Sequence, residues 1–138
     1  MPKFDHPKDL DLWETKAHDI LRAVVMVLDG IFYIYHWLYP KSCPYDCVEV
    51  APQGFWRPKG KGRSFHPIYQ AIDVRVKGLT RIALKLIETV LHFIVKLDYS
   101  NRIQYVYEKA LYDESGECIR GEHIHVEIDT KKDGVYPV

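Results

Sequence analysis

Two short segments of this chain alternate between aliphatic and polar side chains, and this alternation constrains the fold more than any other feature. The segments are residues 71–76 and 123–128. Successive side chains of a strand point to opposite faces, so each segment predicts a strand with one aliphatic face and one polar face. The aliphatic residues are Ile72, Val74, Val76, Ile124, Val126 and Ile128. One face of the predicted sheet therefore needs a cover, and the other can carry chemistry.

Residues 79–97 supply the cover, because they form the clearest helical pattern in the chain. Ala83, Leu86, Ile87, Val90, Ile94 and Leu97 recur at helical spacing. Only a narrow polar stripe remains, which predicts a helix packed on most sides. Residues 48–56 and 103–112 predict two further strands, and residues 113–116 predict a turn. The element order predicts an α+β fold with a small, largely antiparallel sheet of about four strands and helices packed on one face.

The first 47 residues predict a helical region ahead of this core of residues 48–128. Residues 9–28 carry apolar side chains at helical spacing. Asp29-Gly30 is open to two interpretations, a helix end capped by Gly30 or a hairpin turn. We expect a helix end or kink there, followed by a short helix over residues 31–37. The apolar run 24–39 is short for a membrane span and is interrupted by Asp29, so we expect it to be buried or to form an interface.

Length and composition are those of one soluble domain, residues 1–138. Apolar residues make up 47% of the chain and charged residues 28%. The 19 basic and 19 acidic residues cancel, which argues against sequence-independent nucleic-acid binding. The three cysteines, Cys43, Cys47 and Cys118, form an odd set without a visible signal peptide, which predicts reduced thiols and synthesis in the cytoplasm. Cys43 and Cys47 have a metal-binding spacing, but no second cysteine pair completes such a site.

Two histidine clusters supply the ligand types of a catalytic zinc site. His66 and Asp73 belong to the first, and the run Glu122-His123-Ile124-His125 forms the second. Asp73 and His125 fall on the polar faces of their strands, and His66 can fold back to them from the preceding loop. Two imidazoles and one carboxylate leave a fourth position for water, with a glutamate nearby as a base. Singly, each of these side chains is more often an ordinary surface group, so the prediction of a metallohydrolase depends on the two clusters meeting in space.

The first cluster resembles a known motif. The run Ser64-x-His66-x-x-Tyr69-x-Ala71-x-Asp73 is similar to the S-x-H-x-x-G-x-A-x-D motif of zinc D-Ala-D-Ala peptidases. That family includes D-Ala-D-Ala carboxypeptidases, vancomycin-resistance dipeptidases and phage peptidoglycan endopeptidases, and hedgehog signalling domains share its fold. Its second motif, H-x-H or E-x-x-H on the last core strand, is matched in both versions by residues 122–125. The resemblance covers about residues 48–128.

The resemblance implies a zinc peptidase of carboxypeptidase or endopeptidase type that cuts peptides of bacterial peptidoglycan. It implies that His66, Asp73 and His125 bind Zn²⁺. Glu122 would take a proton from the metal's water and pass it to the leaving amine. His123 would stabilise the oxyanion. The expected partner is a peptidoglycan peptide, with no nucleic acid and no stable membrane insertion, and the expected location is the cytoplasm, with later release to the cell wall if the source is a phage.

Four further residues are predicted to contact substrate: Arg57, Arg63, Ser64 and Tyr69. Arg57 or Arg63 could hold a substrate carboxylate, because the planar guanidinium binds a carboxylate through two parallel hydrogen bonds. Tyr69 stands where the family has glycine, and a tyrosine copies a positive-φ glycine only with strain. Either the loop takes another path, or the tyrosine side chain narrows the cleft.

The same resemblance allows a second interpretation, a catalytically inactive domain that keeps zinc for stability and acts as a binding or virion-structural module. Glu122 favours the enzyme, because a purely structural zinc site needs no base. A third interpretation is an unrelated α+β protein whose histidines match by coincidence.

Overall fold

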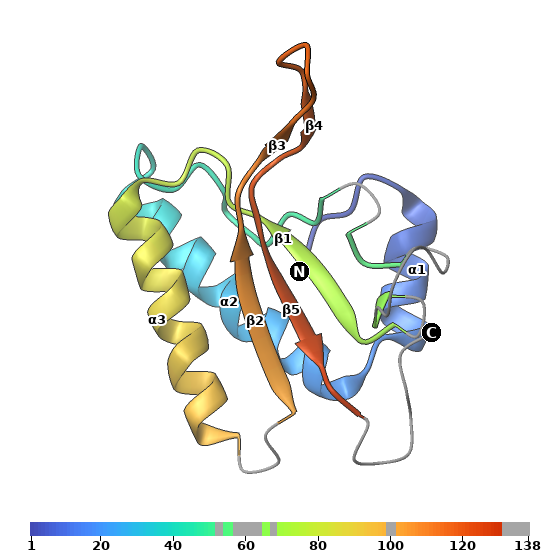
Figure 1. Cartoon of the computed structure of the whole chain (residues 1–138). Helices are drawn as coiled ribbons and strands as arrows, with labels where there is room; N and C mark the ends of the chain where they lie inside the picture. The colour runs from blue at the N-terminus through green and yellow to red at the C-terminus, as the bar shows by residue number, and fades with distance from the viewer. Residues whose placement is uncertain (52–53, 57–64, 67–68, 99–101, 131–138) are drawn as a thin grey trace.

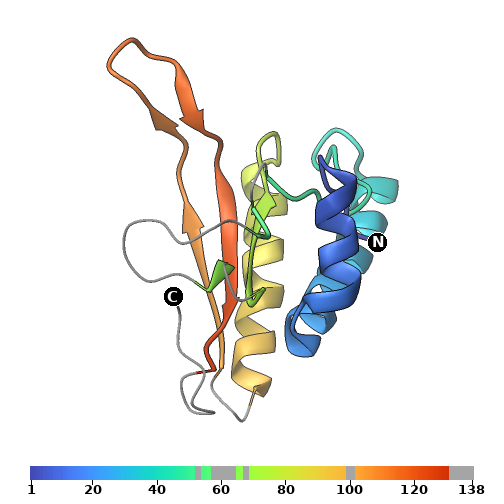
Figure 2. The same ribbon diagram turned by 90° about the vertical axis from the view of Figure 1, so that its right-hand side faces the viewer.

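A layer of helices covers one face of an antiparallel sheet in the computed structural model, which describes residues 1–51, 54–56, 65–66, 69–98 and 102–130 (Figures 1 and 2). The helices are α1 (Pro7–Lys16), α2 (Asp19–Leu38) and α3 (Arg81–Leu97). The strands are β1 (Ala71–Arg75), β2 (Ile103–Glu108), β3 (Leu111–Tyr112), β4 (Cys118–Arg120) and β5 (His123–Ile128). The described residues therefore confirm the predicted α+β class with a small antiparallel sheet.

The main sheet has three strands in the order β1-β5-β2, with both pairs antiparallel. The predicted strand over residues 103–112 is divided into β2 and β3. β3 pairs with β4, a strand that the sequence pattern did not predict. These two strands form a hairpin that projects beyond the main sheet (Figure 1). Its predicted turn is confirmed, since the Gly116 N–H donates to the Asp113 carbonyl at 3.0 Å.

The predicted division of the sheet into an aliphatic and a polar face is confirmed. The aliphatic side chains of β1 and β5, Ile72, Val74, Ile124, Val126 and Ile128, are at most 1% exposed. They share one core with buried residues of α2 and α3, including Leu21, Leu28, Phe32, Ile87 and Leu91. Each fully buried aliphatic side chain contributes about 1.5–3 kcal/mol, so this layer contact dominates the stability of the fold.

The helix predicted over residues 79–97 is confirmed as α3, but the prediction that it is packed on most sides is wrong, because Leu86 and Leu97 are 37% and 71% exposed. It begins after Thr80, whose side-chain oxygen accepts a hydrogen bond from the Ala83 N–H at 3.3 Å. A helix N-terminus leaves such N–H groups without intrahelical partners, so this bond places the start of the helix.

The predicted helix end at Asp29-Gly30 is wrong, because α2 runs unbroken from Asp19 to Leu38. Asp29 is not a turn residue. Its buried carboxylate accepts a hydrogen bond from the Val48 N–H at 2.6 Å and pairs with the amino group of Met1. A buried carboxylate needs such partners, and they explain an acidic residue in an apolar helix.

The actual helix break lies earlier, within the predicted helix 9–28. Ala17 has an extended backbone (φ −61°, ψ 141°) and ends α1. His18 then caps α2, since its Nδ1 accepts a hydrogen bond from the Ile20 N–H at 3.2 Å. The helical spacing of apolar residues continues across this break, so the sequence pattern did not predict it.

The predicted strand over residues 48–56 is also wrong. In its described part, Glu49 and Val50 form only isolated bridges, with Lys3 and Val74 respectively. The chain then turns, and the Gly54 N–H donates to the Ala51 carbonyl at 2.7 Å. A side chain at Gly54 would meet that carbonyl oxygen at 2.7 Å, so only glycine allows this close turn.

Candidate metal centre

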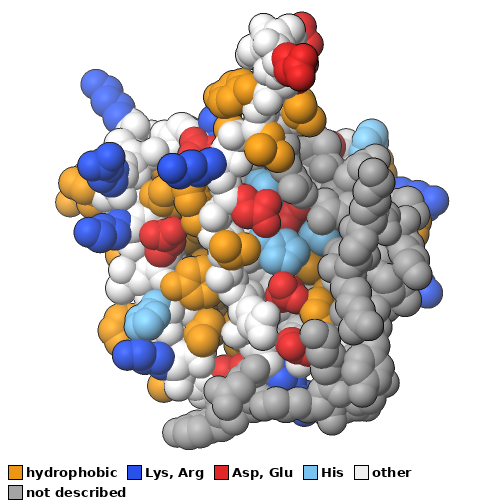
Figure 3. Space-filling view, viewed as in Figure 1, with side chains coloured by type: hydrophobic (Ala, Val, Ile, Leu, Met, Phe, Trp, Pro, Cys, Tyr) orange, Lys and Arg blue, Asp and Glu red, His pale blue; other side chains and the backbone are white. Residues whose placement is uncertain are grey.

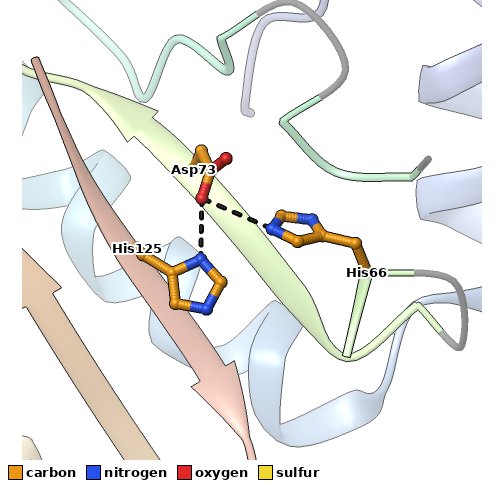
Figure 4. A group of neighbouring side chains, drawn as sticks. All are labelled: His66, Asp73 and His125. Atoms are coloured by element: carbon orange, nitrogen blue, oxygen red, sulfur yellow. Dashed lines mark hydrogen bonds and ion pairs between the residues drawn. The ribbon is translucent and has the colours of Figure 1, made fainter. Parts of the chain in front are cut away.

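Two strands and one loop bring the three predicted ligands to one point (Figure 4). Asp73 in β1 lies directly opposite His125 in β5, and His66 comes from the loop before β1. The candidate ligand atoms of these three residues all lie within 4.8 Å of one another. The two sequence clusters therefore meet, and the buried cluster of His66, Asp73 and His125 can hold a metal ion.

His66 is oriented by a backbone carbonyl. Its ring is fully buried, and its Nδ1 lies 3.0 Å from the carbonyl oxygen of Phe55. A carbonyl only accepts, so Nδ1 carries the hydrogen and the lone pair of the neutral ring is on Nε2. Nε2 lies 3.4 Å from Oδ1 of Asp73, on the side where the cluster converges. Histidines that bind metals usually have this second hydrogen bond, which fixes the tautomer.

An aromatic cluster holds Phe55, and thus its carbonyl, in place. The Phe55 ring packs edge-on against Trp13 of α1 at 5.1 Å between centroids and lies 6.1 Å from Phe4. The neighbouring Gly54 carbonyl accepts the Asp73 N–H at 2.6 Å. The N-terminal region matches no motif, yet it supports the residues that orient the cluster.

The charges of Asp73 and His125 are coupled. Nδ1 of His125 lies 2.8 Å from Oδ1 of Asp73, and its Nε2 lies 3.4 Å from a carboxylate oxygen of Glu127. Burial opposes ionisation of Asp73, but hydrogen bonds with His125 and His66 outweigh it and hold the pKa of this carboxyl well below its usual range. Burial also opposes protonation of His125, but Asp73 and Glu127 raise its pKa to about 9. Without a metal, the Asp73 carboxylate therefore favours a positive charge on His125. A bound cation would supply that positive charge in place of the proton.

This coupling predicts how the stability of the chelator-treated protein depends on pH. The pKa of His125 is about 9 in the folded chain, above the ordinary value of 6.5. The contribution of protonated His125 to the free energy of unfolding is therefore present in full below about pH 6.5, and it is lost as the pH rises through about 9. We expect the free energy of unfolding to fall by up to about 3 kcal/mol over that range. Urea unfolding of the wild type and of His125→Gln checks this, because the variant should lack this part of the slope. Parallel pH profiles for the two proteins would contradict it.

His123 lies beside the cluster but does not belong to it. The ring is buried, and Nδ1 lies 3.0 Å from the carbonyl of Gly121, so Nδ1 carries a hydrogen. Nε2 lies 3.9 Å from Oδ1 of Asp73 and 3.3 Å from a carboxylate oxygen of Glu108. The position next to the metal cluster that the motif implies for His123 is therefore present, while its catalytic role stays a prediction.

Glu122 precedes β5 and lines the same cavity as Asp73, which is the only one of the three candidate ligands among the described lining residues. The cavity has a volume of about 440 Å³. Its other lining residues include Tyr45, Arg75, Lys77, Cys118 and Ile119. The Tyr107 hydroxyl donates a hydrogen bond to the Glu122 carboxylate, which raises the pKa of Tyr107 to about 12. Glu122 is thus oriented by β2, and its catalytic role stays a prediction.

Sequence reasoning missed three groups: Tyr107, which holds Glu122, and Glu108 and Arg75, which flank His123. Glu108 pairs in register with His123, and Arg75 lies opposite His123 on the other side. The alternation of β2 places Glu108 on the polar face, but only the strand order reveals its neighbour. Figure 3 shows the result, with histidine and acidic side chains gathered in the middle of the sheet below the hairpin.

Tyr69 has a left-handed backbone conformation, which glycine adopts most readily. Its φ is 61°, the only positive φ outside glycine among the residues described. A left-handed non-glycine residue costs about 1–2 kcal/mol. The ring offsets this cost by stacking on Trp56 (6.3 Å, 18° between planes) and contacting Phe55 (6.0 Å), and the Lys16 ammonium lies 5.9 Å from its centre.

We therefore expect Tyr69→Gly to destabilise the fold by about 1–2 kcal/mol, because the lost ring packing exceeds the relieved strain. Metal affinity should stay the same, since Tyr69 is not a ligand. Tyr69→Phe keeps the ring and is the matched control, with an expected change near zero. Urea unfolding midpoints measure both. A more stable Tyr69→Gly protein would show that backbone strain outweighs packing.

The other predicted substrate contacts, Arg57, Arg63 and Ser64, lie outside the described residues. The described lining of the cavity does not include Tyr69, so its contact with substrate stays a prediction. The three cysteines are free thiols, and Cys43 and Cys47 take no part in the metal cluster.

Comparisons of the chain with protein-family models, curated proteins and solved structures find no match. The resemblance to zinc D-Ala-D-Ala peptidases therefore depends on the motif residues, and the geometry of His66, Asp73 and His125 is independent of it.

Proposed function

We propose that this protein is a zinc-dependent peptidase that hydrolyses peptides of bacterial cell-wall peptidoglycan, as a D-Ala-D-Ala carboxypeptidase or an endopeptidase. One observation carries the proposal: His66, Asp73 and His125 converge in a buried cluster from three separate segments. Two imidazoles and one carboxylate are the donor set of a catalytic zinc site, which keeps a fourth position open. Sites built only for structure usually have four protein ligands instead.

The surroundings of the cluster fit this metal. His66 donates its Nδ1 hydrogen to the Phe55 carbonyl, and Glu127 lies beside the outer nitrogen of His125. Such outer partners orient the ligands and increase their basicity. Zinc in such a site supplies an acidic water and a positive charge next to the substrate carbonyl.

Glu122 and His123 complete the proposed machinery. Glu122 would accept a proton in the cavity and return it to the leaving amine, while the Tyr107 hydroxyl holds its carboxylate. His123 would place Nε2 near the developing negative charge, with its ring fixed by the Gly121 carbonyl. Glu108, 3.3 Å away, would balance the charge of a protonated His123.

The size of the cavity and its basic lining residues support a peptide substrate with carboxylate groups. Its volume of about 440 Å³ accommodates a few residues, and Arg75 and Lys77 line it together with Asp73. Cationic side chains that line a cavity can bind carboxylates, which peptidoglycan peptides carry. Arg75 is already paired with Asp5 at 2.9 Å, so Lys77 is the more available of the two.

Mass spectrometry of peptides released from purified peptidoglycan tests the proposal. The zinc-loaded protein should release defined peptides, a chelator should stop the release, and added zinc should restore it. The masses identify the bond that is cut. Bound zinc without any released peptide would favour the inactive zinc-binding module. A protein that binds no zinc would overturn both.

A further inference from the structure

The helical layer has an apolar outer side that nothing in the described chain covers. On α2, Met26, Trp37 and Leu38 are 71%, 74% and 65% exposed. Beyond Arg22, the only Asp, Glu, Lys or Arg of this helix is Asp29, which is buried. The last four turns of α2 therefore expose no carboxylate, ammonium or guanidinium group, and the half-buried His36 is paired with the Cys43 carbonyl.

A second exposed apolar row lies on α3, at Ile82, Leu86, Phe93 and Leu97. These positions share one side of the helix. The Thr80 N–H donates to the Ser42 carbonyl at 3.0 Å, which joins the start of α3 to the end of α2. We call the exposed apolar side chains of the two helices the helical outer surface. Its members are Met26, Val27, Tyr33, Ile34, Trp37, Leu38, Ile82, Leu86, Phe93 and Leu97. Each is at least 37% exposed.

Basic residues border this surface. Lys41 follows α2, and α3 exposes Arg81, Lys85 and Lys96. Of the acidic residues of the two helices, Asp19 is exposed at the opposite end of α2 from Lys41, Glu88 of α3 is partly exposed, and Asp29 is buried. Figure 3 shows Lys and Arg side chains beside hydrophobic ones over the N-terminal part of α3. Since the whole chain has a net charge of zero, this is a local excess of positive charge.

These charges distinguish two possible partners of the helical outer surface, a second copy of the chain and a phospholipid bilayer. A two-fold interface between copies of the chain is self-complementary, so it would bring basic rims of the same sign together. An anionic phospholipid surface instead attracts Lys and Arg, takes up aliphatic side chains, and accommodates Trp and Tyr at the headgroup level. We propose that the helical outer surface docks on an anionic phospholipid bilayer, with α2 in the plane of the interface.

Docking is distinct from spanning the membrane. Of the helices described, only α2 has the length and hydropathy to cross a bilayer, but one third of that stretch is buried in the fold. Leu21, Val25, Leu28 and Phe32 are fully buried. The metal cluster lies on the opposite face of the sheet, so docking would leave it open to the aqueous side. The proposal does not depend on the peptidase activity.

Vesicle flotation tests it. The full chain should float with vesicles of phosphatidylcholine mixed with phosphatidylglycerol, and far less with phosphatidylcholine alone. Added salt should weaken the binding, because it screens the basic residues. Absence of binding to the anionic vesicles would overturn the proposal.

Two variants test whether the lipid contact lies on the helical outer surface. Trp37→Ser should weaken binding at least about tenfold, since the exposed indole would be buried in the interface. Lys85→Glu should weaken it at least about fivefold. Ile119→Ser and Lys109→Glu are the matched controls, because both residues are exposed on the hairpin side and should bind like the wild type. Equal losses in variants and controls would refute the assignment.

Analytical ultracentrifugation distinguishes docking on lipid from dimerisation of the chain through the same surface. A monomer is expected for the wild type and for Trp37→Ser. A wild-type dimer that Trp37→Ser dissociates would assign the helical outer surface to a second copy of the chain and overturn lipid docking.

Discussion

Replacing His125 by alanine is expected to lower zinc affinity by at least about a hundredfold and to abolish peptide hydrolysis. Even outer partners of a metal ligand are worth about 10–100-fold in affinity, and His125 is a proposed ligand itself. The variant would leave His66 and Asp73 as the only protein ligands of the cluster. Metal analysis after dialysis, together with a competition titration against a chromophoric chelator, measures the effect.

His92→Ala is the matched control, because His92 is exposed on α3 and lies outside the cluster. It should bind zinc like the wild type. If His125→Ala kept stoichiometric zinc of unchanged affinity, the cluster would not be the metal site, and the proposed function would fail with it.

Replacing Glu122 by glutamine should leave zinc bound and lower kcat by about a hundredfold to ten-thousandfold. An amide has nearly the shape of a carboxylate but cannot accept the proton. It can still accept the hydrogen bond from the Tyr107 hydroxyl, so the local structure should persist. Steady-state kinetics on a defined peptidoglycan peptide, with metal content measured in the same sample, checks both parts.

Glu127→Gln distinguishes the two glutamates that lie nearest to this role. Glu127 contacts His125, so its loss should weaken zinc binding and leave the proton transfer to Glu122. Full turnover by Glu122→Gln with loss of turnover by Glu127→Gln would reverse the assignment.

The strand pattern predicted correctly that Asp73 and His125 share the polar face of the sheet, because a period of two residues is a local property. Once Asp73 and His125 fall on polar faces, any antiparallel pairing of β1 with β5 brings those faces together. The register that sets Asp73 opposite His125 is not visible in either strand alone. It depends on the whole sheet, in which β5 lies between β1 and β2.

The N-terminal errors have a different cause. Asp29-Gly30 has the local signature of a helix end, yet Asp29 binds the Val48 N–H and the Met1 amino group. Those partners lie far away in the sequence, so the local pattern carried no trace of them. In the same way, the strand predicted near Val50 gave way to the close turn at Gly54, which is set by contact with Ala51 and Asp73. Propensity is a weak guide wherever tertiary contacts compete with it.

Tyr69 was not predictable from local propensity, because a left-handed backbone favours glycine. Its φ of 61° is held by the stacking of its ring on Trp56. The sequence indicates neither this backbone conformation nor the ring contact that stabilises it.

The distance along the chain between the ligands has a further consequence. In the sequence, His66 precedes α3 and β2 and His125 follows them. A metal held by both histidines would therefore close a large loop in the polypeptide. Closing a loop of this size removes conformational entropy from the unfolded chain, by analogy with a disulfide, and about 4 kcal/mol is the scale for such a cross-link. The metal would then act as a reversible cross-link, and the resistance of the chain to proteolysis would depend on the supply of zinc.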